Sequence, residues 1–96
     1  MRTLMLVHHR VADFSTWKQV YDGYRDAQRQ GGVRFHQVLR SREDPGMVVV
    51  THVFDSRAEA EAFVNDPDLQ ATMGRAGVDA STVVIEYLDE VDYGDI

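Results

Sequence analysis

Histidines are the residues of this 96-residue chain whose side chains could do acid–base chemistry near neutral pH. There are four, His8, His9, His36 and His52, and all lie in segments that we predict to be strands. A neutral imidazole can take a proton from a phenol or an activated C–H group, because its unperturbed pKa is about 6.5. The sequence therefore suggests a histidine as general base, although the simpler interpretation is that each is a hydrogen-bonded strand residue.

Three of the histidines could also bind a metal ion, but their spacing matches no local ligand motif. His8 and His9 are adjacent on a strand, so their side chains point to opposite faces. His9, His36 and His52 could converge only if strand pairing brings His36 to the same face, which the sequence leaves open. The chain has no cysteine, so thiolate ligands and a cysteine nucleophile are excluded. We predict no metal, with this histidine cluster as the open alternative.

An aromatic stripe follows Asp13, a residue type that can cap a helix. Phe14, Trp17 and Tyr21 recur at intervals of three to four residues, which is typical of one face of a helix running to about Gln30. The stripe is most simply the contact between this helix and a sheet. Trp17 and Tyr21 could at the same time line a flat apolar cavity for an aromatic ligand.

The remaining segments alternate in a simple order. Asp44-Pro45-Gly46 marks a hairpin turn, and Ser56–Glu59 has the spacing of a capping box. The expected strands cover residues 3–11, 33–40, 47–54 and 82–88, and the expected helices cover residues 14–30, 57–65 and 67–76. This order predicts a single domain, residues 1–96, of the α+β class with ferredoxin-like βαββαβ topology. Its four-stranded antiparallel sheet has the strand order 4-1-3-2, with the helices on one face.

Apolar residues occupy both faces of the first and third predicted strands. Leu6 and Val7 point to opposite faces of the first strand, and Val49 and Val50 do so on the third. The helices can cover only one face of the sheet, and a chain of this length has no further element for the other. We therefore predict a homodimer in which two copies pack sheet against sheet.

Composition and motifs exclude several classes of protein. The chain carries 10 Lys and Arg against 16 Asp and Glu, a formal net charge of −6, which argues against nucleic acid as a partner. No apolar run approaches the roughly 20 residues of a membrane span. The short N-terminal run is followed by His8, His9 and Arg10 rather than by a cleavage site, so we expect a cytoplasmic protein. No glycine-rich phosphate loop or GxGxxG motif is present, and we predict no cofactor.

The chain resembles the dimeric α+β barrel superfamily, and within it the antibiotic-biosynthesis-monooxygenase-like and small polyketide-cyclase-like proteins. The resemblance spans nearly the whole chain and is carried by Val11-Ala12-Asp13 before the aromatic helix, Asp44-Pro45-Gly46, Phe54-Asp55-Ser56, Asn65 to Leu69, and Met73 to Val78. It implies a homodimer with a ligand pocket between the sheet and helices of each subunit. By this resemblance His9 and His52 face the helices on neighbouring strands, whereas Leu6 and His8 face the partner.

The resemblance implies a small cofactor-independent enzyme, of monooxygenase or cyclase type, acting on an aromatic or polyketide-like molecule. His52 or His9 would be the general base. Other residues expected at the pocket are Val7, Trp17, Tyr21, Val50, Phe54, Phe63, Met73 and, if the register allows, His36. The alternative is a non-catalytic dimeric module that binds a small molecule or serves in a stress response. A cavity of ~300 Å³ or more beside both histidines would favour the enzyme.

Overall fold

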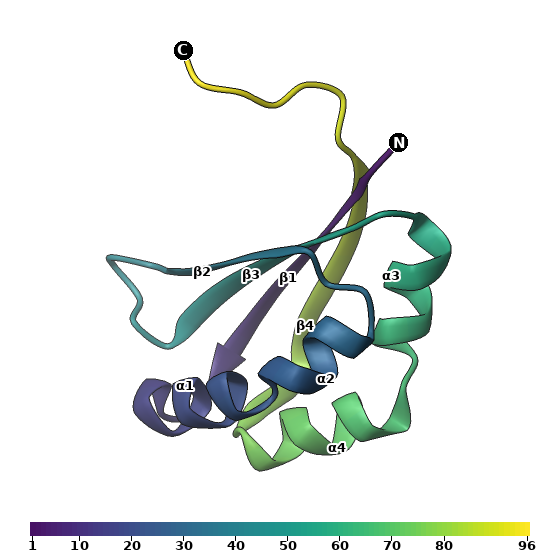
Figure 1. Cartoon of the computed structure of the whole chain (residues 1–96). Coiled ribbons are helices and arrows are strands. Elements are labelled where there is room, and N and C mark those ends of the chain that lie inside the picture. Colours follow the sequence, from purple (N-terminus) through teal and green to yellow (C-terminus); the bar gives the residue numbers. More distant parts are fainter.

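Four antiparallel strands form one sheet, and the helices pack against one of its faces (Figure 1). The computed structural model describes all residues from Met1 to Ile96. The strands are hydrogen-bonded in the order β2-β3-β1-β4, which confirms the predicted order and the ferredoxin-like fold. None of the helices combines the length and the apolar surface that crossing a lipid bilayer requires. The elements follow one another as β1 (Thr3–Val11), α1 (Phe14–Gly23), α2 (Arg25–Gln30), β2 (Phe35–Arg40), β3 (Met47–Phe54), α3 (Arg57–Val64), α4 (Pro67–Arg75) and β4 (Val78–Asp89).

The predicted helix over residues 14–30 is in fact two helices. α1 ends at Gly23 and α2 begins at Arg25, with Tyr24 between them at φ −93° and ψ 10°. The Tyr24 amide donates to the carbonyl of Tyr21 at 3.1 Å, three residues back instead of four. Glycine weakens a helix, and beyond the adjacent residues and the backbone of its own helix no atom lies within 4 Å of the place where a Cβ of Gly23 would be. The break between α1 and α2 therefore coincides with a residue of low helix propensity and not with a close packing contact at Gly23.

Two strands differ in length from the expectation. β2 begins at Phe35 rather than at residue 33, and β4 starts at Val78 rather than at residue 82. The pairing of β4 with β1 shifts between His8 and Arg10, where the Arg10 amide donates to Thr82 Oγ1 at 2.9 Å. The polar stretch before Thr82 has no alternating apolar pattern, so the sequence did not reveal this extension.

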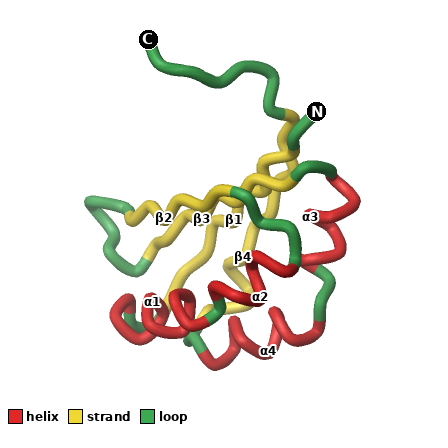
Figure 2. The backbone as a smooth tube through the Cα atoms, in the orientation of Figure 1, coloured by secondary structure: helices red, strands yellow, loops and turns green.

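The predicted helix caps are confirmed. Asp13 accepts a hydrogen bond from the Thr16 amide at 3.0 Å, and Ser56 accepts one from the Glu59 amide at 3.2 Å. Gly77 follows α4 at φ +79°, a left-handed conformation that glycine adopts without strain. Figure 2 shows how the loops at these ends return every helix to the same side of the sheet.

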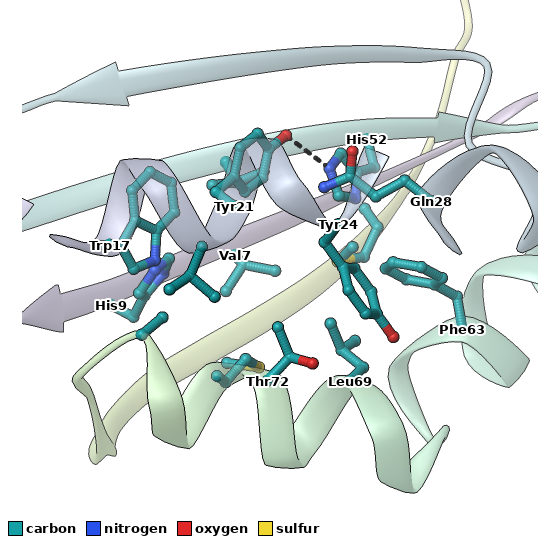
Figure 3. A pocket seen from close by; sticks show the side chains of 15 residues that line it. Val7, His9, Trp17, Tyr21, Tyr24, Gln28, His52, Phe63, Leu69 and Thr72 are labelled. Atoms are coloured by element: carbon teal, nitrogen blue, oxygen red, sulfur yellow. Dashed lines mark hydrogen bonds between the residues drawn. The ribbon is translucent and has the colours of Figure 1, made fainter. Parts of the chain in front are cut away.

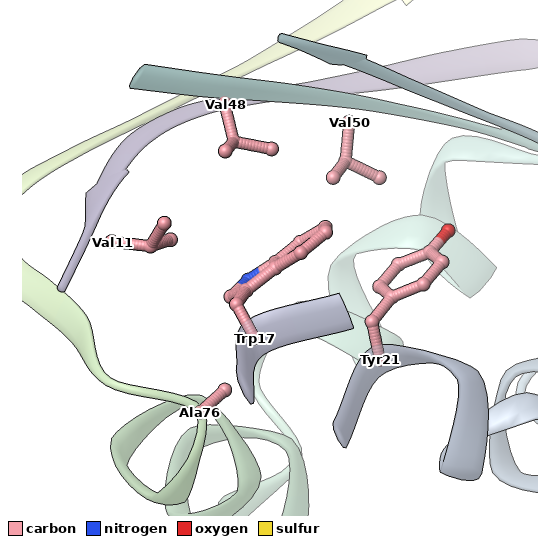
Figure 4. Close-up of a cluster of buried hydrophobic side chains, with 6 residues drawn as sticks. All are labelled: Val11, Trp17, Tyr21, Val48, Val50 and Ala76. Carbon is pink, nitrogen blue, oxygen red and sulfur yellow. The ribbon is translucent and has the colours of Figure 1, made fainter. Parts of the chain in front are cut away.

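Alternate residues of the two central strands build the core under the helices. The odd-numbered residues from Thr3 to His9 are buried in β1, and the even-numbered residues from Val48 to Phe54 are buried in β3. This confirms the predicted faces, with His9 and His52 on the helix side. One core cluster, shown in Figure 4, consists of Val11, Trp17, Tyr21, Val48, Val50 and Ala76. The other consists of Met5, Val7, Phe54, Ala60 and Phe63.

The opposite face of the sheet is covered by no helix (Figure 1). The strand pairing places His8 of β1 beside Val49 of β3 on this face. Leu39 of β2 lies beside Val49, and Val84 of β4 lies beside His8. These two residues keep 46% and 53% of their surface exposed. A wide apolar sheet face is thus left open to solvent, and this is the face through which we predict the homodimer to form.

Candidate active site

A cavity of about 80 Å³ lies between the sheet and the four helices α1 to α4 (Figure 3). Its wall is mostly apolar, and both His9 and His52 belong to it. Pockets for small molecules usually enclose about 300 Å³ or more. The prediction of histidines in a helix–sheet cavity is confirmed, but the volume beside them is smaller than the one we expected for an enzyme.

A second hollow of about 350 Å³ adjoins this cavity on the side of β4. The two spaces share Met5, Val7, Leu69 and Met73 in their walls. Leu69 and Met73 are side chains of α4, and methionine adapts its shape easily. A ligand larger than the cavity beside the histidines would therefore have to displace these two side chains and occupy both spaces.

His52 lies in the wall of the cavity with only 4% of its surface exposed. Its Nε2 atom is 3.0 Å from the hydroxyl oxygen of Tyr21, and its ring meets Phe63 edge-on with centroids 5.7 Å apart. Its Nδ1 atom is buried and has no hydrogen-bond partner. Burial lowers the pKa of His52 to about 4, with smaller contributions from His36 and Arg25, so the ring is neutral at pH 7.

His36 faces the same side of the sheet as His52, its direct partner in the pairing of β2 with β3. This answers the question of register that the sequence left open. Nδ1 of His36 is 3.0 Å from the Tyr21 hydroxyl, and Nε2 is 2.6 Å from Nη1 of Arg25. His36 lines a separate hollow beside α2, so it reaches the cavity only through Tyr21.

His9 lines the opposite end of the cavity from His52 (Figure 3). In the strand pairing His52 lies beside Met5, four residues before His9, which is a separation of roughly 13 Å along the strand. The His9 ring lies against Trp17 with centroids 5.7 Å apart. Burial, with a smaller contribution from His8, lowers the pKa of His9 to about 4. The two histidines share one cavity but are too far apart to exchange a proton directly.

The three histidines on the helix side do not form a ligand cluster. His9 is at one end of the cavity, while His36 and His52 both bond to Tyr21 at the other. No group of three or more histidine, cysteine, aspartate or glutamate side chains has the arrangement of a metal site. The alternative of a cluster of His9, His36 and His52 is therefore wrong.

Most of the residues predicted to line the pocket do lie in its wall. Phe54 does not: it is fully buried, with its ring centroid 5.7 Å from that of Phe63 and 6.3 Å from that of His52. It therefore supports the wall from behind. Contact between the lining residues and a ligand stays a prediction. The predicted residues found in the wall, besides the histidines, are Val7, Trp17, Tyr21, Val50, Phe63 and Met73.

Gln28 is a polar residue of the cavity that the sequence did not indicate. It lies off the aromatic stripe, but the break at Tyr24 changes the phase of the helix and turns Gln28 toward the sheet. Only 3% of its surface is exposed, and its Oε1 atom has no hydrogen-bond partner. An unpaired buried amide oxygen is costly, so this atom, like Nδ1 of His9 and of His52, is a polar contact that the cavity offers to a ligand.

Acid should destabilise the fold through His52. Its pKa is lowered from the ordinary 6.5 to about 4, so between these values the unfolded chain binds more protons, and stability falls as pH falls. The loss at pH 4.5 relative to pH 7.5 is about 2 to 3 kcal/mol for this group. Urea unfolding at both pH values should show a loss smaller by about 2 kcal/mol in His52→Gln than in the wild type. Equal losses in the two proteins would contradict this origin.

Comparisons with known proteins point to one family. A family model described as antibiotic biosynthesis monooxygenase matches residues 13–75. No curated protein sequence matches the chain. Solved structures share its fold, and at their low sequence identities the likeness concerns the fold alone.

Three of these structures illustrate the likeness. A candidate antibiotic biosynthesis monooxygenase from Caulobacter crescentus has a TM-score of 0.76 and 21% identity, covering 95% of this chain and 91% of that chain. Rv0793 from Mycobacterium tuberculosis has a TM-score of 0.73 and 15% identity, covering 99% and 100%. A mutant of SnoaB, a cofactor-independent oxygenase from Streptomyces nogalater, has a TM-score of 0.75 and 16% identity, covering 96% and 95%.

Proposed function

Because the chain belongs to the antibiotic biosynthesis monooxygenase family, we propose that it is a small cofactor-independent oxygenase for an aromatic or polyketide-like molecule. The observation that carries the proposal is the apolar, aromatic cavity that two buried histidines line. The likeness to SnoaB, which is described as a cofactor-independent oxygenase, supports a reaction without a cofactor. The general base is His52 or His9, and each is neutral at pH 7 because burial lowers its pKa.

The proposed reaction converts an activated CH₂ group of the substrate into a carbonyl group. A histidine takes one proton and leaves a carbanion, whose charge spreads into a ring that carries a ketone or phenol. The carbanion reacts with dioxygen to form a C–O bond and, with the proton returned, a hydroperoxide. Loss of the second C–H proton then breaks the O–O bond and releases water. The sum is CH₂ + O₂ → C=O + H₂O, so dioxygen is the only oxidant.

Stacked rings along α1 support the choice of an aromatic substrate. The Trp17 ring lies 5.0 Å from that of Tyr21 and 5.8 Å from that of Phe14, with interplanar angles of 19° and 29°. A flat substrate can extend such a stack at little cost, because offset aromatic faces attract one another. The polar atoms of the cavity that lack a protein partner belong to His9, Gln28 and His52. Together these features suit a flat molecule with few polar groups.

A non-catalytic dimeric module that binds a small molecule or serves in a stress response is the second candidate. The volume of about 80 Å³ beside the histidines favours it, because a polycyclic substrate needs more room than this. The oxygenase requires the cavity and the adjoining hollow of about 350 Å³ to join when the substrate binds. The binding module requires no base, and it requires such a rearrangement only for a ligand that is larger than the cavity.

Dioxygen uptake with 1,8-dihydroxyanthrone as the probe tests the proposal. Protein dialysed against EDTA, with no cofactor added, should consume equimolar dioxygen and form the anthraquinone faster than the buffer alone. The fluorescence of Trp17, which is the only tryptophan and lies in the cavity wall, should be quenched on binding. Quenching without uptake would favour the binding module. If neither quenching nor uptake is observed, an anthrone-like ligand is ruled out for both candidates.

A further inference from the structure

A chain of hydrogen bonds joins the surface of the molecule to the cavity. It leads from Arg25 of α2 to His36 of β2 over 2.6 Å and from His36 to the hydroxyl of Tyr21 over 3.0 Å. From that hydroxyl it leads over 3.0 Å to His52, the inner link that Figure 3 shows. His36 is exposed and His52 is buried, so the chain crosses from solvent to the interior.

The proton positions along this chain follow from Arg25, because a guanidinium group can only donate hydrogen bonds. Nε2 of His36 must therefore accept, so the neutral His36 ring carries its proton on Nδ1 and donates it to the Tyr21 oxygen. The Tyr21 hydroxyl in turn donates to Nε2 of His52. Since this Nε2 is an acceptor, the neutral His52 ring carries its proton on Nδ1.

The side chains of this hydrogen-bonded chain are in the protonation states that this order of donors and acceptors requires. Burial raises the pKa of Tyr21 to about 12, so the hydroxyl keeps its proton. Burial lowers the pKa of His36, and the nearby charges of Arg25 and Lys18 lower it further. His36 and His52 are therefore both neutral above pH 7, and each ring has one donor and one acceptor.

We infer that Arg25, acting through His36 and Tyr21, fixes the tautomer of His52 so that its Nδ1–H group is offered to the cavity as a hydrogen-bond donor. This Nδ1 is a buried atom without a partner in the protein. An unpaired buried N–H group is costly unless a ligand accepts from it. The ligand group that fits is an acceptor, such as a ketone or phenolate oxygen. Arg25 and His36 are positioning residues, because they act through another side chain.

The catalytic consequence of this tautomer rests on the proposed function. In that reaction His52 and His9 have different roles. A donor at His52 can stabilise the oxyanion that forms when a C–H proton leaves the substrate. In this tautomer the lone pair of His52 is on Nε2 and accepts the hydrogen bond from Tyr21, so His52 is not the base. The hydrogen-bonded chain from Arg25 does not reach His9, which is left to accept the proton at the other end of the cavity.

Two-bond ¹H–¹⁵N correlation spectra of the imidazole rings, recorded at pH 8 on the ligand-free protein, test the inference. We expect His52 to be in the Nδ1–H tautomer alone. In Arg25→Leu the fixed donor is lost, so His52 should become a mixture of both tautomers. Arg25→Lys, whose ammonium group also only donates, should keep the wild-type tautomer. Arg29→Leu is the matched control on the same helix, because Arg29 pairs with Asp26, and it should leave His52 unchanged.

Two results would overturn the inference: a wild-type His52 with its proton on Nε2, or a His52 tautomer that stays unchanged in Arg25→Leu. Tyr21→Phe cuts the chain in the middle, so adding Arg25→Leu to this variant should have no further effect on His52. A further effect would show that Arg25 acts by another route and would also overturn it. These spectra do not depend on turnover, so they can fail while dioxygen uptake succeeds, and the reverse.

Discussion

The variant His9→Gln should turn over 1,8-dihydroxyanthrone ~10²–10⁴-fold more slowly than the wild type, which is the usual contribution of a general base. Glutamine is similar in size and forms hydrogen bonds, but it has no titratable nitrogen. Quenching of Trp17 fluorescence should change little, because the stacked rings that bind the probe stay in place. Dioxygen uptake measured against probe concentration separates kcat from KM and should place the loss in kcat.

The matched variants at the other end of the cavity are His52→Gln and His52→Leu. Glutamine keeps an N–H donor, so His52→Gln should lose much less activity than His9→Gln. Leucine has no donor, and His52→Leu should lose ~10²–10³-fold, as when one donor to an oxyanion is removed. A loss in His52→Gln as large as in His9→Gln would make His52 the base instead. No loss in either glutamine variant would contradict a histidine base, and unfolding of both would favour the binding module.

The fold was predictable from the sequence because its signals are local. The caps at Asp13 and Ser56 and the turn before Met47 depend on neighbours in the chain, and the structure confirms them. The helix break at Tyr24 was not predictable, because the apolar spacing continues through it. Tyr24 still points toward the cavity, and its hydroxyl donates to Asp68 of α4 at 3.0 Å. Contacts between helices, rather than propensity alone, give such a residue its place.

The candidate site was predictable only in part, because its geometry depends on contacts between distant segments. The period of two along a strand puts His9 on the face of Met5 and Val7, and His52 on that of Val48 and Val50. That these are the same face of the sheet was implied by the family resemblance and not by the pattern, because both strands are apolar on both sides. The roughly 13 Å between the two histidines depends on the register of β1 with β3, which the apolar pattern of Val48 to Val50 does not determine. The contact of Arg25 with His36 joins α2 to β2 and depends on how the break in the helix directs α2.

Val49→Asp should convert the predicted homodimer into a folded monomer. Val49 lies on the open face of the sheet, between His8 of β1 and Leu39 of β2. In a monomer the new carboxylate would be in contact with water, so the fold should survive. In a dimer packed sheet against sheet it would be buried without a partner, which costs several kcal/mol and should raise the dimer Kd by at least ~10²-fold.

Sedimentation velocity at micromolar concentration measures this effect, and far-UV circular dichroism shows whether the monomer is folded. Ala58→Asp is the control, because Ala58 is exposed in the first turn of α3, where an acidic residue is tolerated, and the dimer should persist. A Val49→Asp dimer as stable as the wild type would mean that the open face is not the interface. A wild-type monomer at this concentration would mean that the open apolar face of β1 and β3 stays exposed. That result would contradict the homodimer predicted from apolar residues on both faces of these strands.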